Sequence, residues 1–225
     1  MKRHFPINHF KKFQSPLSFF VTLVTFFALI AILSSCTDGL NRGYKFQPES
    51  MHWLQFRGLD ASGIAPGEAT PPIHFSADSN LLWKTEVLPG WSSPCIVNDR
   101  IYLTGFDQED SLLYTFALCR EHGEILWRDS VRLENSYFIH PTTTHANPTV
   151  ASNGNMIFSH FPAYGLLAYD LDGNRAWEFT HEILSQSIYG GSASPVIADT
   201  VLILLVNSET DPRIVGLDLQ TGDLT

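Results

Sequence analysis

Apolar and polar positions alternate along most of this chain in short runs that end at Gly, Asn, Asp or Pro. The runs are rich in Val, Ile, Leu, Tyr and Phe, which is typical of β-strands. After residue 36 no segment keeps a sustained helical period. The pattern therefore predicts an all-β protein with strands at 95–97, 100–104, 112–118, 124–128, 149–151, 156–159, 165–169, 176–179, 196–197, 201–206 and 213–217.

The predicted strands recur as a long repeat. Gly123, Gly173 and Gly222 each close one unit, and they lie 50 and 49 residues apart. Repeats near this length that consist of short strands are typical of β-propeller blades. We therefore expect a β-propeller of four-stranded antiparallel blades, with about three blades visible of a ring of seven or eight. A proline opens the inner strand of each unit, at Pro94, Pro148 and Pro195.

Two segments before the first unit are also assigned by pattern. Residues 81–87 resemble an outer strand, and we expect them to complete the last blade of an intact ring. The stretch 53–75 is rich in Gly and Pro, so we expect a loop that packs on one face of the disc. At the other end, Gly222 predicts a tryptophan just past Thr225. We therefore expect the chain to be an N-terminal fragment, in which residues 53–225 form a partial propeller that is truncated at its C-terminus.

The first 36 residues predict an export signal. A basic leader without acidic residues precedes an uncharged run over 17–33, and small residues then lead to Cys36. This order is that of a secretory signal peptide, and its end resembles the bacterial lipobox, in which the cysteine is lipidated. An uncleaved membrane anchor is the alternative, for which the run is short. Residues 37–52 are expected to form a polar tether.

The charge after the leader limits the class of partner. The remaining sequence has 10 basic and 23 acidic residues, which gives a net charge of −13. Such a surface lacks the basic patch that nucleic acid or anionic headgroups require. We therefore expect no nucleic-acid partner, and contact with the membrane only through the lipid. The expected place is the cell envelope, at the outer membrane, facing the periplasm or the outside.

The closing motifs resemble the PQQ-like propeller repeats, whose tryptophans dock between neighbouring blades. The stretches Ala168-x-Asp170…Gly173…Trp177 and Gly216-x-Asp218…Thr221-Gly222 fit that repeat, whereas Cys119 replaces the expected acid in the first unit. The resemblance covers 53–225 and implies the fold more strongly than any activity. It assigns inter-blade docking to Trp83, Trp127 and Trp177.

Two branches of that family offer rival functions. One branch contains non-catalytic scaffold lipoproteins of the outer-membrane barrel-assembly machinery, and the other contains periplasmic dehydrogenases that bind PQQ and calcium. The dehydrogenases commonly have two adjacent cysteines, and this chain has none adjacent. No matching set of calcium ligands is found either, so no cofactor or metal is assigned. We interpret the chain as a non-catalytic scaffold for envelope proteins; the alternative is a PQQ-dependent oxidoreductase or a saccharide-active envelope enzyme.

Four candidate binding residues lie in the connections that precede the inner strands: Trp91, His140, His145 and Tyr189. If these connections share one face, the side chains surround the axis and suit a ligand or a peptide. The alternative is ordinary packing between blades. For the loop 140–145 itself, the alternatives are a metal pair of histidines and a polar loop that hydrogen-bonds to the neighbouring blade.

The two cysteines beyond the leader are assigned as buried free thiols. Cys95 and Cys119 fall on the first and third strands of one unit, which are not neighbours. A disulfide is the alternative, because the compartment is oxidising.

Overall fold

The computed structural model describes residues 52–65, 70–134, 137–180, 188–207 and 211–225. All of them belong to the second of two compact units, which spans Lys45–Thr225. The expected signal peptide, Cys36 and nearly all of the tether lie outside the described residues. Among the described residues, no helix has the length and apolar character needed to span a bilayer.

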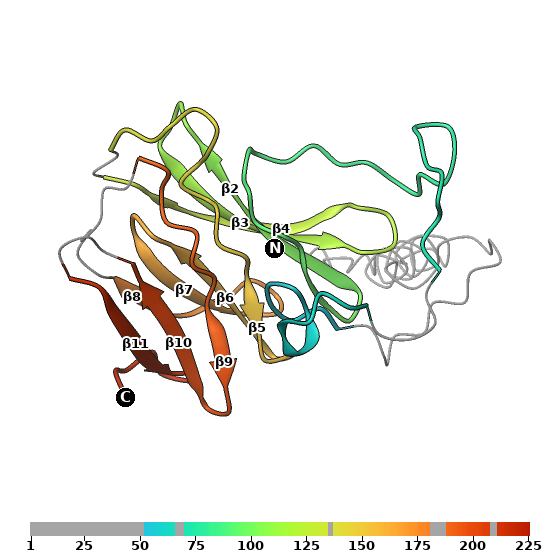
Figure 1. The fold of residues 1–225 in the computed structure, drawn as a ribbon. Coiled ribbons are helices and arrows are strands. Elements are labelled where there is room, and N and C mark those ends of the chain that lie inside the picture. The colour runs from blue at the N-terminus through green and yellow to red at the C-terminus, as the bar shows by residue number, and fades with distance from the viewer. Residues whose placement is uncertain (1–51, 66–69, 135–136, 181–187, 208–210) are drawn as a thin grey trace, which may run out of the picture. The chain divides into compact units, whose positions relative to one another are not determined.

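The described strands form three antiparallel sheets, which we call blades 1, 2 and 3 (Figure 1). The predicted strands are confirmed, with ends that differ by a few residues. Blade 1 contains β1 (Cys95–Val97), β2 (Arg100–Asp107), β3 (Leu112–Cys119) and β4 (Ile125–Arg132); blade 2 contains β5 (Ala151–Ser152), β6 (Met156–Phe161), β7 (Gly165–Asp170) and β8 (Arg175–Thr180); blade 3 contains β9 (Val196–Ala198), β10 (Val201–Val206) and β11 (Arg213–Asp218).

Both faces of blade 2 are buried, and they pack against different neighbours. In β7, Leu167 and Tyr169 belong to a core cluster shared with blade 1, which includes Tyr102 and Leu113. The alternate residues Leu166 and Ala168 belong to the cluster shared with blade 3. Successive side chains of a strand point to opposite faces, so an unbroken apolar run is what a sheet between two sheets requires. Sheets that follow one another and pack face to face in this way are the blades of a β-propeller.

The turn between the first two strands of each blade has a left-handed residue. Asn98, Gly154 and Asp199 have φ angles of 54°, 91° and 55°. Asn, Asp and Gly accept this conformation at least cost, so the Asn/Asp/Gly pattern of the sequence fixes where each hairpin reverses.

Residues 81–87 do not pair as a strand among the described residues, and their expected place in a last blade stays a prediction. These residues have no strand assignment, because the described residues offer them no ladder partner. Their contacts are made by side chains: Trp83 Nε1 donates to Arg120 O at 3.0 Å, and Thr85 Oγ1 donates to Gly123 O at 2.6 Å. The segment is therefore attached to blade 1 by side-chain docking on the β3–β4 turn.

The N-terminal stretch contacts the inner strands directly. Trp53 and Ile96 exchange two backbone hydrogen bonds of 2.9 Å, and Ser152 N donates to Leu54 O at 2.8 Å. Residues 53 and 54 thus lie along the inner edges of β1 and β5, which the expectation of a loop on one face did not include. A short 3-10 helix, η2 (Leu59–Ala61), follows them.

Candidate binding face and its pocket

Each blade is joined to the preceding segment by one tryptophan. Trp127 Nε1 donates to Leu171 O at 2.9 Å, and a Cβ on Gly173 would lie 2.6 Å from the Trp127 ring. The indole therefore packs directly on the backbone of Gly173, because any side chain at this position would overlap the ring. The same pairing occurs between Trp83 and the turn at Arg120 and Gly123, and between Trp177 and the turn at Leu219 and Gly222.

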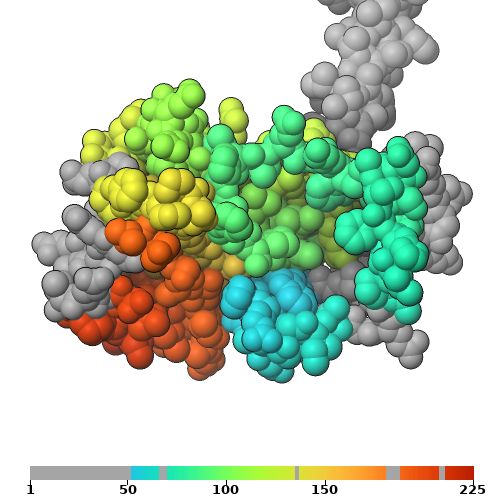
Figure 2. Space-filling model, turned by 45° about the horizontal axis from the view of Figure 1, so that its top comes forward, coloured from blue at the N-terminus to red at the C-terminus, as the bar shows by residue number. Residues whose placement is uncertain are grey.

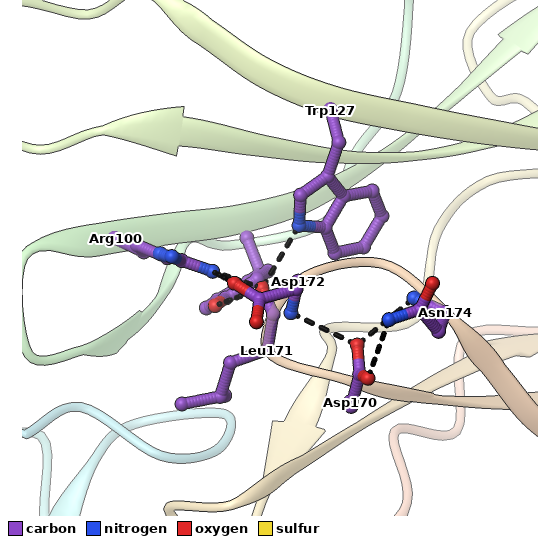
Figure 3. A network of polar contacts seen from close by, with 7 residues as sticks. Arg100, Trp127, Asp170, Leu171, Asp172 and Asn174 are labelled. Atoms are coloured by element: carbon purple, nitrogen blue, oxygen red, sulfur yellow. Dashed lines mark hydrogen bonds and ion pairs between the residues drawn. The ribbon is translucent and has the colours of Figure 1, made fainter. Parts of the chain in front are cut away.

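An aspartate shapes the turn that receives Trp127 (Figure 3). Asp170 Oδ1 accepts from the backbone N–H groups of Asp172 and Asn174, both at 2.9 Å. The Asn174 side chain donates to Asp170 Oδ2 at 2.7 Å, and this bond is the main reason why the pKa of Asp170 is lowered. Arg100 of blade 1 donates to Leu171 O and pairs with Asp172 Oδ1. Tyr102 OH also donates to Leu171 O at 3.3 Å, so the turn presents its carbonyl to three donors of the preceding blade.

Blade 1 has a cysteine where blades 2 and 3 have the aspartate that shapes this turn. Asp218 of blade 3 accepts from the N–H groups of Gln220 and Thr221, as Asp170 does in its own turn. Cys119 takes the place of the acid in blade 1, and its Sγ lies 3.4 Å from His122 Nε2. The backbone of the turn is kept, because Gly123 N still donates to Cys119 O at 2.8 Å.

The inner strands begin next to one another. Ser93 N donates to Thr149 Oγ1 at 3.1 Å, and Thr149 N donates to Ser194 Oγ at 2.9 Å. Trp91 N also donates to Ala146 O at 2.9 Å. Short hydroxyl side chains therefore link the entries of blades 1, 2 and 3. This brings the three preceding connections to one face of the fold.

Asn147 fixes the two long connections to each other. Its side chain exchanges hydrogen bonds with Thr143 at 2.9 and 3.1 Å and donates to Gly191 O at 3.4 Å. Thr143 Oγ1 lies 3.1 Å from Tyr189 O, and His140 N donates to Ile188 O at 2.6 Å. The loop 140–145 is therefore bonded to the connection of the next blade, as the polar-loop interpretation predicts.

A pocket of about 340 Å³ opens on this face. Three exposed aromatic side chains surround it: Trp91 is 64% exposed, Tyr189 61% and Phe56 51%. In Figure 2 the yellow residues of the loop before β5 lie between green residues of blade 1 and the orange connection of blade 3. The pocket is lined by Phe56, Trp91, Thr142, Thr143, Asn147, Thr149, Tyr189, Ser192 and Ser194.

The structure brings three of the four candidate residues together. Trp91 and Tyr189 line the pocket, and the His140 ring lies 5.6 Å from the Tyr189 ring. His145 is only 4% exposed and lies edge-on against Phe106 and Tyr137, with ring centroids 5.0 Å away in both cases. Its burial lowers its pKa, which a hydrogen bond with the Tyr137 backbone opposes. His145 is a packing residue beneath the face.

Sequence reasoning missed other residues of the pocket. Phe56 reaches it because residues 53 and 54 pair with the inner strands, and no local pattern indicates that pairing. Thr149 and Ser194 flank the inner-strand prolines Pro148 and Pro195. Short hydroxyl side chains next to these prolines are the signal that could have indicated them as lining residues.

The described residues do not fit the cofactor set of the dehydrogenase branch. Cys95 and Cys119 are buried and are not joined in a disulfide, and they lie on β1 and β3 with β2 between them. Burial raises the pKa of the Cys95 thiol to about 12, so it stays protonated. The pocket lining holds no carboxylate, which a hard cation would need. No group of three or more His, Cys, Asp or Glu side chains suited to a metal occurs in the part of the chain that the structure describes.

Solved structures of known proteins resemble the fold. The quinohemoprotein alcohol dehydrogenase ADHIIG of Pseudomonas putida HK5 matches with a TM-score of 0.54 and 17% identity, over 78% of this chain and 26% of that one. BamB of Moraxella catarrhalis matches with a TM-score of 0.43 and 15% identity, over 64% and 41%. The quinohemoprotein alcohol dehydrogenase of Comamonas testosteroni matches with a TM-score of 0.44 and 14% identity, over 61% and 20%.

The chain covers between 20% and 41% of the length of four solved structures that it matches. No curated protein sequence matches it significantly. A family model matches residues 73–225, which is more than half of the chain. The chain therefore belongs to the PQQ-like repeat family whose model is described as outer membrane protein assembly factor BamB.

Proposed function

We propose that this chain is a non-catalytic scaffold at the cell envelope that binds other envelope proteins. The family description, an outer-membrane assembly factor, supports this class of function. The proposed location is the outer membrane, through a lipid on Cys36 after cleavage of the signal peptide. The pattern that ends at Cys36 supports the anchor.

The observation that carries the proposal is a set of exposed apolar side chains, the apolar rim, on the face formed by the connections before the inner strands. Phe138 and Ile188 are exposed and lie on the two connections that Asn147 bonds together. Ile188 directly precedes Tyr189, which lines the pocket. Exposed aromatic and aliphatic side chains on a fixed backbone suit a protein interface, because little conformational entropy is lost when a partner binds.

A photo-crosslinking amino acid at Ile188 or Phe138 tests the scaffold in intact cells. We expect each position to crosslink to a discrete envelope protein. The matched control is Phe75, which is exposed and lies outside the pocket lining, and we expect no such product there. Equal crosslinking at all three positions, or none at any, would contradict a docking surface at this rim.

Two further experiments address the anchor and the alternative function. Cys36→Ser is expected to move the protein from the membrane fraction to the soluble fraction, and retention in the membrane would contradict lipid anchoring.

Incubation with PQQ and Ca²⁺ followed by gel filtration tests the dehydrogenase alternative. We expect no quinone absorbance to coelute with the chain, since the described residues supply no carboxylate cluster.

A further inference from the structure

We infer that the pocket between Trp91, Phe56 and Tyr189 binds a neutral saccharide. This inference goes beyond the proposed scaffold function and does not rest on it. The scaffold uses the apolar rim at Phe138 and Ile188, whereas the saccharide would occupy the pocket itself.

The aromatic side chains supply the apolar half of such a site. Trp91, Tyr189 and Phe56 are all more than half exposed around one cavity. Exposed rings that gather around one cavity indicate an interaction site, whereas rings exposed singly do not. The C–H faces of a pyranose ring are apolar and flat, so they pack well on an aromatic ring, whose face carries partial negative charge.

The hydroxyl side chains supply the polar half. Thr149 Oγ1 accepts the N–H of Ser93, and Ser194 Oγ accepts the N–H of Thr149. A hydroxyl that accepts a hydrogen bond still has its own hydrogen to donate. Two adjacent donors in the pocket lining therefore match the oxygen atoms of a sugar. The loop hydroxyls of Thr142 and Ser192 also line the pocket.

The charge distribution selects a neutral ligand over an anionic one. None of the nine lining residues is acidic or basic. The whole chain has a net charge of −9, which disfavours an anion that finds no cationic partner. Recognition by uncharged hydroxyl, amide and aromatic groups alone is the chemistry that a neutral saccharide needs.

At β1 and β5 the backbone near the pocket disfavours an extended peptide. A peptide that adds to a sheet needs a free strand edge. The inner edge of β1 is already paired with Trp53, and Leu54 O accepts from Ser152 at the edge of β5. The pocket volume, about 340 Å³, lies near the lower end for small-ligand sites and suits one or two sugar rings.

Titration of the purified full chain with tetra-N-acetylchitotetraose and with maltotetraose, by calorimetry, tests the inference. We expect at least one of them to bind with a Kd of about 1 mM or tighter. Trp91→Ala should weaken this binding by about 10-fold or more, and Ser192→Ala by a smaller factor. Phe75→Ala is the matched control for loss of an exposed ring and should leave the Kd unchanged.

Three results would overturn the inference. The first is no binding of either oligosaccharide at about 10 mM. The second is binding that Trp91→Ala leaves unchanged, which would place the ligand elsewhere. The third is tighter binding of tetra-alanine or tetragalacturonate, which would indicate a peptide or an acidic sugar. All three are independent of the crosslinks at Ile188 and Phe138, so failure here is distinguishable from failure of the scaffold proposal.

Discussion

The indole N–H of Trp127 in blade 1 donates to the carbonyl oxygen of Leu171 in blade 2 at 2.9 Å. The ring lies on Gly173, where even a methyl group would overlap it. Because Trp83 and Trp177 make the same contact with their own partner turns, one geometry repeats along the chain. Blades held in this way have their inner strands side by side, and the connections before those strands meet on one face.

Removal of the indole N–H alone should weaken this contact measurably. Trp127→Phe keeps an aromatic ring on Gly173 but loses the hydrogen bond to Leu171 O. We expect a decrease of about 1 kcal/mol in the free energy of unfolding, measured by urea denaturation. Trp91→Phe is the matched control, because Trp91 is largely exposed, and it should change stability by less than about 0.5 kcal/mol. Equal effects of the two variants would contradict a structural role of the N–H.

His145 should make stability depend on pH. Burial lowers its pKa in the folded protein below the ordinary value of 6.5. The unfolded chain therefore binds the proton more readily, and the free energy of unfolding decreases as the pH falls from about 6.5 through the folded pKa. His145→Phe retains a ring between Phe106 and Tyr137 and should reduce this decrease. Urea denaturation at about pH 7.5 and pH 5 checks it; an identical loss in both proteins would contradict it.

Asn147 should control the order of the loop face. Asn147→Ala removes its bonds to Thr143 and Gly191, and we expect amide hydrogen exchange at 140–147 and 188–191 to become about 10-fold faster. Asn147→Asp keeps an acceptor for Thr143 and loses the donor to Gly191 O. It should therefore affect 188–191 more than 142–144. Unchanged exchange in both variants would show that other contacts hold the face.

The strands of the three blades could be predicted from the sequence because they depend on patterns among neighbouring residues. Alternation, turn residues and the glycine spacing predict every strand of the three sheets, and the left-handed turns follow from Asn98, Gly154 and Asp199. No strand forms at 81–87 among the described residues, because a strand needs a partner, and its own residues cannot indicate whether one is present. A docked side chain, Trp83, makes the contact in its place.

The pocket depends on contacts that no local pattern encodes. Trp91 and Tyr189 both lie in connections that precede an inner strand, which is why the repeat pattern indicates them. Phe56 arrives through the pairing of Trp53 with Ile96, across about 40 residues of intervening chain. For His145 the sequence pattern misleads in the other direction. It lies in a loop of the binding face, yet its side chain packs beneath that face between Phe106 and Tyr137.

A double-mutant cycle between Trp127 and Gly173 tests the stacking of blades most directly. Gly173 has a φ of 89°, and its added Cβ would lie 2.6 Å from the Trp127 ring, whereas Gly154, with a φ of 91°, has nothing within 4 Å. Gly154→Ala should therefore cost only the backbone strain, about 1–2 kcal/mol, and Gly173→Ala should cost more.

The decisive quantity is the cost of Gly173→Ala in the Trp127→Ala background, measured by urea denaturation. If the indole of blade 1 rests on the turn of blade 2, that cost falls to the value for Gly154→Ala, and the two substitutions couple by about 1–3 kcal/mol. Additive costs would mean that the ring and the glycine do not touch, and would contradict the side-by-side arrangement of the blades on which the binding face depends.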